Sequence, residues 1–203
     1  MRALSIALAL VSLVNGAQAV ENSHWKEPMA GLDRMVGFWE VTTFARDTDG
    51  EWQAGHITLS SIDHEPGSAV LREDALVVDP RNRFELLGYW SWDRSQDTYR
   101  VAVMDKRLGV TDVYEGTDTE DGLVLTKDSA GKVFTGGDDR DRPVRLRQEF
   151  PGPERYILYV EESIGDRWQD FLRIEYRRKS PQAAPAAEVL MQNRDFITGA
   201  NML

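Results

Sequence analysis

The chain has 203 residues, with 34 Asp or Glu, 24 Lys or Arg, three His and no Cys. This length suits one globular domain, and 41% apolar residues can build an ordinary core, which argues against wholesale disorder. The net charge of -10 argues against binding to nucleic acid or to an anionic membrane, since both need a basic surface. The lack of Cys excludes disulfides, thiol nucleophiles, thiolate metal sites and a lipid-modified N-terminal cysteine.

Residues 1–19 have the pattern of a secretory signal peptide. Arg2 supplies a basic start, residues 3–14 form an apolar run, and Ala17-Gln18-Ala19 is a small-x-small cleavage motif. The alternative is a membrane anchor, but this run has about 12 residues where a span needs roughly 20. We therefore expect cleavage after Ala19, no stable membrane anchor, and a secreted or periplasmic protein. Removing one Arg and no acid changes the net charge from -10 to -11.

The rest of the chain reads as strands separated by turns. Residues 28–36 predict one or two helical turns, and runs rich in β-branched and aromatic residues then alternate with Gly, Pro, Asn and Asp turns. The predicted strands are 38–46, 52–62, 69–78, 83–92, 98–105, 110–115, 123–127, 144–150, 155–162 and 168–178.

These strands follow one another through hairpin-length connections, which favours antiparallel pairing of sequence neighbours. About ten such strands without covering helices bury one face most simply by closing on themselves, and closure also removes exposed edges. We therefore predict an all-β fold: an antiparallel up-and-down β-barrel of about ten strands with a short N-terminal helical turn. A sandwich of two sheets is the alternative.

Several short motifs carry a family resemblance. They are Gly37-x-Trp39-Glu40 after the apolar turn 32–36, Ser91-Trp92-Asp93 with Tyr99 and Asp105, Tyr114-Glu115-Gly116 with Gly122-Leu123-x-Leu125, and Glu175-Tyr176-Arg177-Arg178. On these motifs the region from about residue 32 to 178 resembles the DUF1579 family of uncharacterised bacterial proteins, whose members look like calycin or fatty-acid-binding β-barrels. The resemblance implies a barrel and brings no established catalytic residues. The family tends to have Gly-Tyr-Asp where this chain has Ser91-Trp92-Asp93.

The Gly37-x-Trp39 pair is also similar to the start of a lipocalin barrel. There a helical turn closes one end, glycine lets the chain bend into the first strand, and tryptophan plugs that end. We expect Gly37 and Trp39 to have this structural role.

Aromatic side chains with polar ends suit a pocket for a small hydrophobic or aromatic molecule. We assign Trp90, Trp92, Tyr99 and Tyr114 to such a ligand site, with Arg72, Arg145 and Arg147 holding an acidic head group. The alternative is a solid aromatic core. Gly88 interrupts the aromatic face of the fourth strand, either to make room for a ligand or to relieve barrel curvature.

Charged residues recur with a period of two in residues 71–76 and 144–150. One face of these two strands is therefore polar. It faces either the solvent, which is the simpler interpretation, or a ligand cavity where each charge must be paired.

The sequence gives little support for metal binding, haem binding or a serine hydrolase. His56 and His64 lie roughly 25 Å apart if extended, too far for one zinc ion, and no His follows to serve as a haem ligand. The acidic turns at residues 47–50, 118–122 and 138–141 lack the Glu that completes a calcium loop. We therefore expect no metal and no cofactor.

There is no Gly-x-Ser-x-Gly motif, although abundant carboxylates leave open a hydrolase or isomerase that uses carboxylate and Tyr residues.

The sequence divides into a signal peptide (1–19), a lead (20–31), a barrel domain (32–179) and a Pro/Ala-rich linker with a C-terminal tail (180–203). Our leading hypothesis is an exported barrel that binds a small hydrophobic or aromatic molecule. An enzyme on the same barrel and a solid-cored protein acting through its surface are the alternatives.

Overall fold

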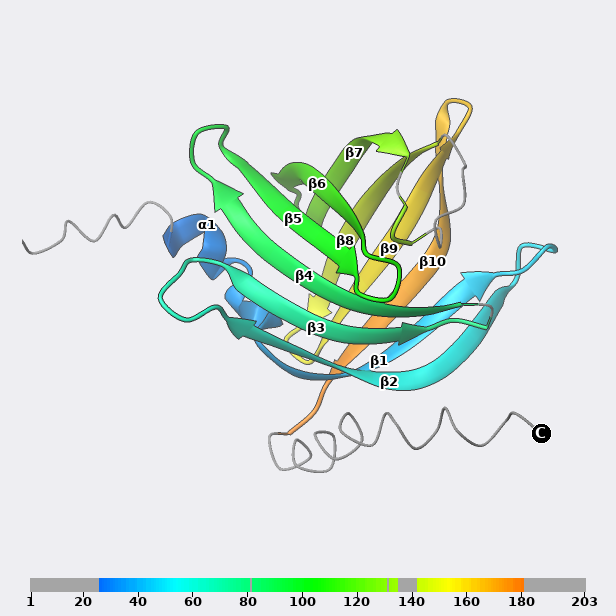
Figure 1. Ribbon diagram of the computed structural model, residues 1–203, viewed down its shortest axis with the longest axis horizontal. Helices are drawn as coiled ribbons and strands as arrows, with labels where there is room; N and C mark the ends of the chain where they lie inside the picture. The colour runs from blue at the N-terminus through cyan, green and yellow to red at the C-terminus, as the bar shows by residue number, and fades with distance from the viewer. Residues whose placement is uncertain (1–25, 81, 131, 135–141, 181–203) are drawn as a thin grey trace, which may run out of the picture.

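The computed structural model describes residues 26–80, 82–130, 132–134 and 142–180. A short helix and a single 3-10 turn precede ten strands (Figure 1). The elements are α1 (Lys26–Ala30), η2 (Asp33–Met35), β1 (Gly37–Arg46), β2 (Trp52–His64), β3 (Leu71–Val78), β4 (Arg83–Asp93), β5 (Thr98–Asp105), β6 (Val110–Asp118), β7 (Gly122–Ala130), β8 (Pro143–Gly152), β9 (Arg155–Ile164) and β10 (Arg167–Arg178).

The ten strands form one closed antiparallel barrel. Each strand pairs with its neighbours in sequence, and β1 pairs with β10 from Trp39 opposite Arg178 to Ala45 opposite Leu172. The predicted all-β barrel is thus confirmed, and the two-sheet alternative is wrong. Closure leaves no free sheet edge among these strands, as the fold argument requires.

The predicted strands agree closely with the observed ones. The interval 98–105 is reproduced as β5, whereas β6 and β7 run several residues further than their predicted intervals. Sequence patterns miss such extensions because a strand continues for as long as it pairs with its neighbour. Asp118, for example, belongs to β6 because it pairs with Leu123 of β7. The predicted helical segment 28–36 is divided between α1 and η2.

Side chains alternate between the interior and the outer surface along each strand. In β3, for example, Leu71, Glu73, Ala75 and Val77 are buried, and the residues between them are more exposed. The interior therefore draws mainly on every second residue of the strands, with interruptions at the bulges.

One end of the barrel, which we call the helical end, is closed by α1 and η2. The Trp39 indole nitrogen donates to the carbonyl of Met35 at 2.8 Å, and the Tyr99 hydroxyl donates to the carbonyl of Pro28 at 2.8 Å. The Arg178 guanidinium donates to the carbonyl of Val36 at 2.7 Å and stacks over the Trp39 ring. These contacts tie the N-terminal segment to β1, β5 and β10.

Gly37 makes the bend into β1. Its φ of 143° favours glycine, and a Cβ placed there would lie 2.4 Å from a guanidinium nitrogen of Arg178. The helical end therefore needs both the conformation and the small size of glycine at this position.

The opposite end is covered by residues 132–134, between β7 and β8. Val133 and Phe134 are buried, and Phe134 lies against Phe84. A carboxylate oxygen of Asp112 accepts the backbone N–H groups of Lys132 at 2.6 Å and Val133 at 2.8 Å. One interior carboxylate thus anchors this segment.

Residues 1–25 and 181–203 lie outside the described residues. These include the predicted signal peptide, half of the lead and nearly all of the predicted linker and tail. No helix within the described ranges is long and apolar enough to cross a membrane.

We predict that Trp39→Ala lowers the free energy of unfolding by about 3–5 kcal/mol, because a fully buried indole and its hydrogen bond are lost together. Urea denaturation measures this change. Trp168→Ala is the control: Trp168 is exposed on the outer surface, and we expect a loss below about 1 kcal/mol. Similar losses in the two variants would contradict the role assigned to Trp39.

Candidate functional site

Glu73 on β3 is a buried carboxyl group inside the barrel. One of its oxygens accepts hydrogen bonds from the Tyr176 hydroxyl at 2.9 Å and the Ser60 hydroxyl at 3.3 Å. The other accepts the Trp90 indole N–H at 3.2 Å. Strands β2, β4 and β10 therefore each direct one neutral donor at the same carboxyl group.

Aromatic rings form the wall on one side of this group. Tyr156 stacks on Tyr176 with ring centres 4.0 Å apart and planes 15° apart. Trp39 presents an edge-to-face contact to Tyr156 at 4.9 Å and to Tyr176 at 6.5 Å. Pairing of Val41 with Tyr176 and of Tyr176 with Tyr156 brings these rings together.

The surroundings favour the neutral form of the Glu73 carboxyl. Burial raises the pKa of Glu73, hydrogen bonds from Tyr176, Trp90 and Ser60 oppose this only in part, and the charge of Asp74 raises the pKa further. Burial, with the nearby Glu73 charge, also raises the pKa of Tyr176 well above its usual value. Tyr176 is therefore a stable hydrogen-bond donor at physiological pH.

Several polar atoms of the interior have no hydrogen-bond partner in the described part of the chain. They include the side-chain oxygen of Gln148 and the hydroxyl of Thr43. The Gln148 amide nitrogen does donate, at 3.5 Å, to the sulfur of Met35 beneath the same aromatic cluster. A buried polar atom without a partner costs about 1–3 kcal/mol, so each of these atoms favours an incoming polar group.

The four aromatic residues assigned to a ligand site from sequence all belong to the inner side of the barrel. Trp90 contacts Glu73, whereas Trp92 packs edge-on against Tyr99 with ring centres 4.7 Å apart. Tyr99 is tied to the helical segment, and Tyr114 donates to Asp112 at 3.4 Å. These residues thus do not converge on one site, and only Trp90 joins the cluster around Glu73.

The three arginines assigned to an acidic head group lie on the outer surface. Arg145 and Arg147 both contact the carboxylate of Glu161, and Arg72 lies 3.9 Å from Asp74. Each points away from the interior because its sequence neighbours are the buried ones. The contacts of these arginines therefore give no support to a role inside the barrel.

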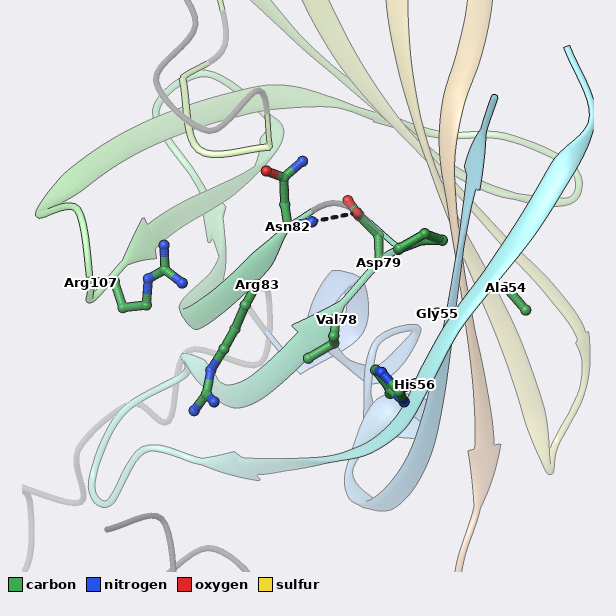
Figure 2. Close-up of a pocket in the computed structure, with 9 residues that line it drawn as sticks. Ala54, Gly55, His56, Val78, Asp79, Asn82, Arg83 and Arg107 are labelled. Carbon is green, nitrogen blue, oxygen red and sulfur yellow. Dashed lines mark hydrogen bonds between the residues drawn. The ribbon is translucent and has the colours of Figure 1, made fainter. Parts of the chain in front are cut away.

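A pocket of about 610 Å³ lies at the rim opposite the helical end (Figure 2). Its lining residues are Ala54, Gly55, His56, Val78, Asp79, Pro80, Asn82, Arg83 and Arg107. Asp79 accepts the backbone N–H of Asn82 at 2.7 Å, which shapes the turn between β3 and β4. This lining is polar and has no Trp, Tyr or Phe, so it suits a flat apolar molecule less well than the interior does.

The two histidines considered as metal ligands are separated in the structure. His56 lines the rim pocket, whereas His64 lies 3.2 Å from Asp33 beside the helical end. Within the described ranges, no group of three or more His, Asp or Glu residues is arranged to hold a metal ion.

Sequence reasoning did not single out Glu73, Ser60 or Gln148. Glu73 stands between Arg72 and Asp74 in a run of charged residues. In such a run the position of Glu73 on the same strand face as Leu71 and Ala75 is easily missed. The available signal was this period of two, which places one charged residue of 71–76 among apolar residues.

Comparison with models of known protein families finds no match for this chain. A search of curated proteins also finds no match. The resemblance to the DUF1579 family therefore stays a prediction.

We predict that the stability gained from Glu73→Gln grows as the pH rises from 4 to 8. The pKa of Glu73 is raised in the folded protein relative to the unfolded chain. As the pH rises from the pKa of the unfolded chain to that of the folded protein, the wild type therefore loses folding stability. Glutamine keeps an acceptor without the charge. Urea unfolding at pH 4, 6 and 8 measures the difference.

The matched control is Glu115→Gln, since Glu115 lies on the outer surface beside Arg100. We expect no growing gain for this variant. A stability difference between Glu73→Gln and the wild type that stays constant with pH would contradict the assignment.

Proposed function

We propose that this protein is an exported barrel that binds a small, mainly apolar or aromatic molecule around Glu73. The observation that carries the proposal is the buried carboxyl group of Glu73, which accepts hydrogen bonds from neutral donors and lies beside the stacked rings of Tyr156 and Tyr176. A ligand with one or two polar groups pairs with this carboxyl group and lays its apolar part on the rings.

The architecture supports this proposal. Barrel diameter grows with strand number, and eight strands already leave an interior that side chains fill or that holds one small ligand. Ten strands enclose a wider interior. The large rings of Trp39, Trp90, Tyr156 and Tyr176 narrow it near the helical end.

Entry is expected from the end opposite α1. The helical end is tied to three strands by side-chain contacts from Trp39, Tyr99 and Arg178. Residues 132–134 at the opposite end are held by two backbone hydrogen bonds to the carboxylate of Asp112 and by the burial of Val133 and Phe134.

A second candidate function is catalysis. The hydrogen bond of 2.9 Å between Tyr176 and Glu73 joins a tyrosine hydroxyl and a carboxyl group, the two kinds of group that we assign to a hydrolase or isomerase on this barrel. Turnover of the bound molecule would distinguish an enzyme from a carrier.

Native mass spectrometry of the protein purified from its own cells tests the binding function. We expect one small molecule per chain, released by mild denaturation, and a mature mass that corresponds to cleavage after Ala19. A chain that carries nothing and binds no member of a panel of hydrophobic and aromatic compounds would overturn the proposal and favour a solid-cored protein. An uncleaved mass would overturn the export part alone.

We further predict that Tyr156→Phe weakens binding of the native ligand about 5-fold, because the ligand loses one hydrogen bond of roughly 1 kcal/mol. Calorimetric titration measures this change in affinity.

Tyr89→Phe is the control for this measurement, because Tyr89 is exposed on the outer surface. Equal affinities of the Tyr156→Phe variant and the wild type would show that the ligand does not reach this hydroxyl.

A further inference from the structure

Glu73 differs from most buried acids of this barrel in the charge of its partners. Glu161, Glu162, Glu175 and Asp112 are buried, and each forms an ion pair with an arginine or lysine. The contacts of Glu73 are with Tyr176, Trp90 and Ser60, all of them neutral. Inside the described barrel, this carboxyl group has no cationic side chain paired with it.

Asp105 is also buried without an ion pair, but its setting differs. It accepts the backbone N–H of Arg107 at 2.9 Å and so shapes the turn after β5. Its strand partners are Leu86 and Val110, which are aliphatic. The combination of an unpaired acid with a wall of aromatic rings is found at Glu73.

Aromatic faces next to a carboxylate attract cations. The face of a Trp or Tyr ring binds an ammonium or guanidinium group through its quadrupole. Trp39 already does so, because the Arg178 guanidinium lies 4.2 Å from its ring centre. That guanidinium is held by the carbonyls of Val36 and Arg34, at the helical end.

Gly88 leaves the wall beside Glu73 without a side chain. A Cβ at this position would lie 3.4 Å from Glu73 Cβ, 3.6 Å from the carboxylate oxygen Oε2 and 3.5 Å from the Trp90 indole nitrogen. These are ordinary contact distances, so glycine leaves a methyl-sized space beside the carboxylate oxygen that Trp90 also contacts.

We propose that the ligand is a small organic cation, an amine with an apolar or aromatic body, and that Glu73 is its counter-ion. The ammonium group approaches Oε2 past Gly88, and the body lies against the rings of Tyr156 and Tyr176. This inference rests on the proposed binding function and names its ligand class.

The charge balance favours such a ligand. An ionised carboxylate inside a barrel is costly unless it is paired, and the bound ammonium supplies the missing partner. Because burial raises the pKa of Glu73, a neutral Glu73 releases its proton when the cation binds. Tyr156 and Tyr176 face the carboxyl from β9 and β10, and burial keeps both hydroxyls protonated by raising the pKa of each.

Titration calorimetry of the full mature chain at pH 7 with three compounds of one size tests the ligand class. The compounds are 2-phenylethylamine, the neutral 2-phenylethanol and the anion phenylacetate. We expect the amine to bind at least about 10-fold more tightly than the alcohol, and phenylacetate to bind most weakly. Glu73→Gln should remove the preference for the amine and change the affinity for the alcohol less than about 3-fold.

Gly88→Ala is an independent test that keeps the charge of Glu73. The added methyl group fits at contact distance, so the fold is kept while the approach to Oε2 is blocked, and we expect at least about a 10-fold loss of amine affinity. Gly152→Ala is the control, because a Cβ there meets no atom within 4 Å.

The outcomes separate the two proposals. If the alcohol binds as tightly as the amine, or if neither Glu73→Gln nor Gly88→Ala weakens amine binding, the cation inference is overturned and the binding function stands. If none of the three compounds binds, and the purified protein also carries no ligand, both proposals are overturned.

Discussion

The pairing of β1 with β10 is the constraint on which the rest of this structure depends. Seven residues of β1, from Trp39 to Ala45, pair in register with β10. This contact turns a twisted ten-stranded sheet into a closed wall and decides which half of the side chains is removed from water. It also brings Trp39 and Val41 beside Tyr176, so that the aromatic cluster exists only because the first and last strands meet.

Because closure removes the interior from water, each polar group inside the barrel needs a hydrogen-bond or ionic partner. Asp112 meets this demand with Lys127, and Glu162 meets it with Arg142. Glu73 instead has three neutral donors, and the side-chain oxygen of Gln148 has no hydrogen-bond partner in the described part of the chain. A protein selected for stability alone gains by replacing such groups with apolar ones, which is why we place function at this cluster.

Arg145 and Arg147 show what a local sequence pattern can predict about the face on which a side chain lies. In residues 144–150 the period of two separates Val144, Leu146 and Gln148 from Arg145 and Arg147, and the structure buries the first set. The solvent-facing interpretation is therefore correct for these two arginines. The same pattern is ambiguous at residues 71–76, where both faces carry charge and Glu73 lies on the inner one.

The sequence by itself determined the strands, their turns and their antiparallel order, because strand propensity, side-chain alternation and turn chemistry act over a few neighbouring residues. Burial of aromatic residues such as Trp90 also follows from that alternation. The tertiary structure alone decided where Tyr176 meets Glu73, that no cation reaches this carboxyl from the described chain, and that Gly88 leaves room beside it. These features depend on side chains from β2, β3, β4 and β10, which barrel closure brings together and which no local pattern encodes.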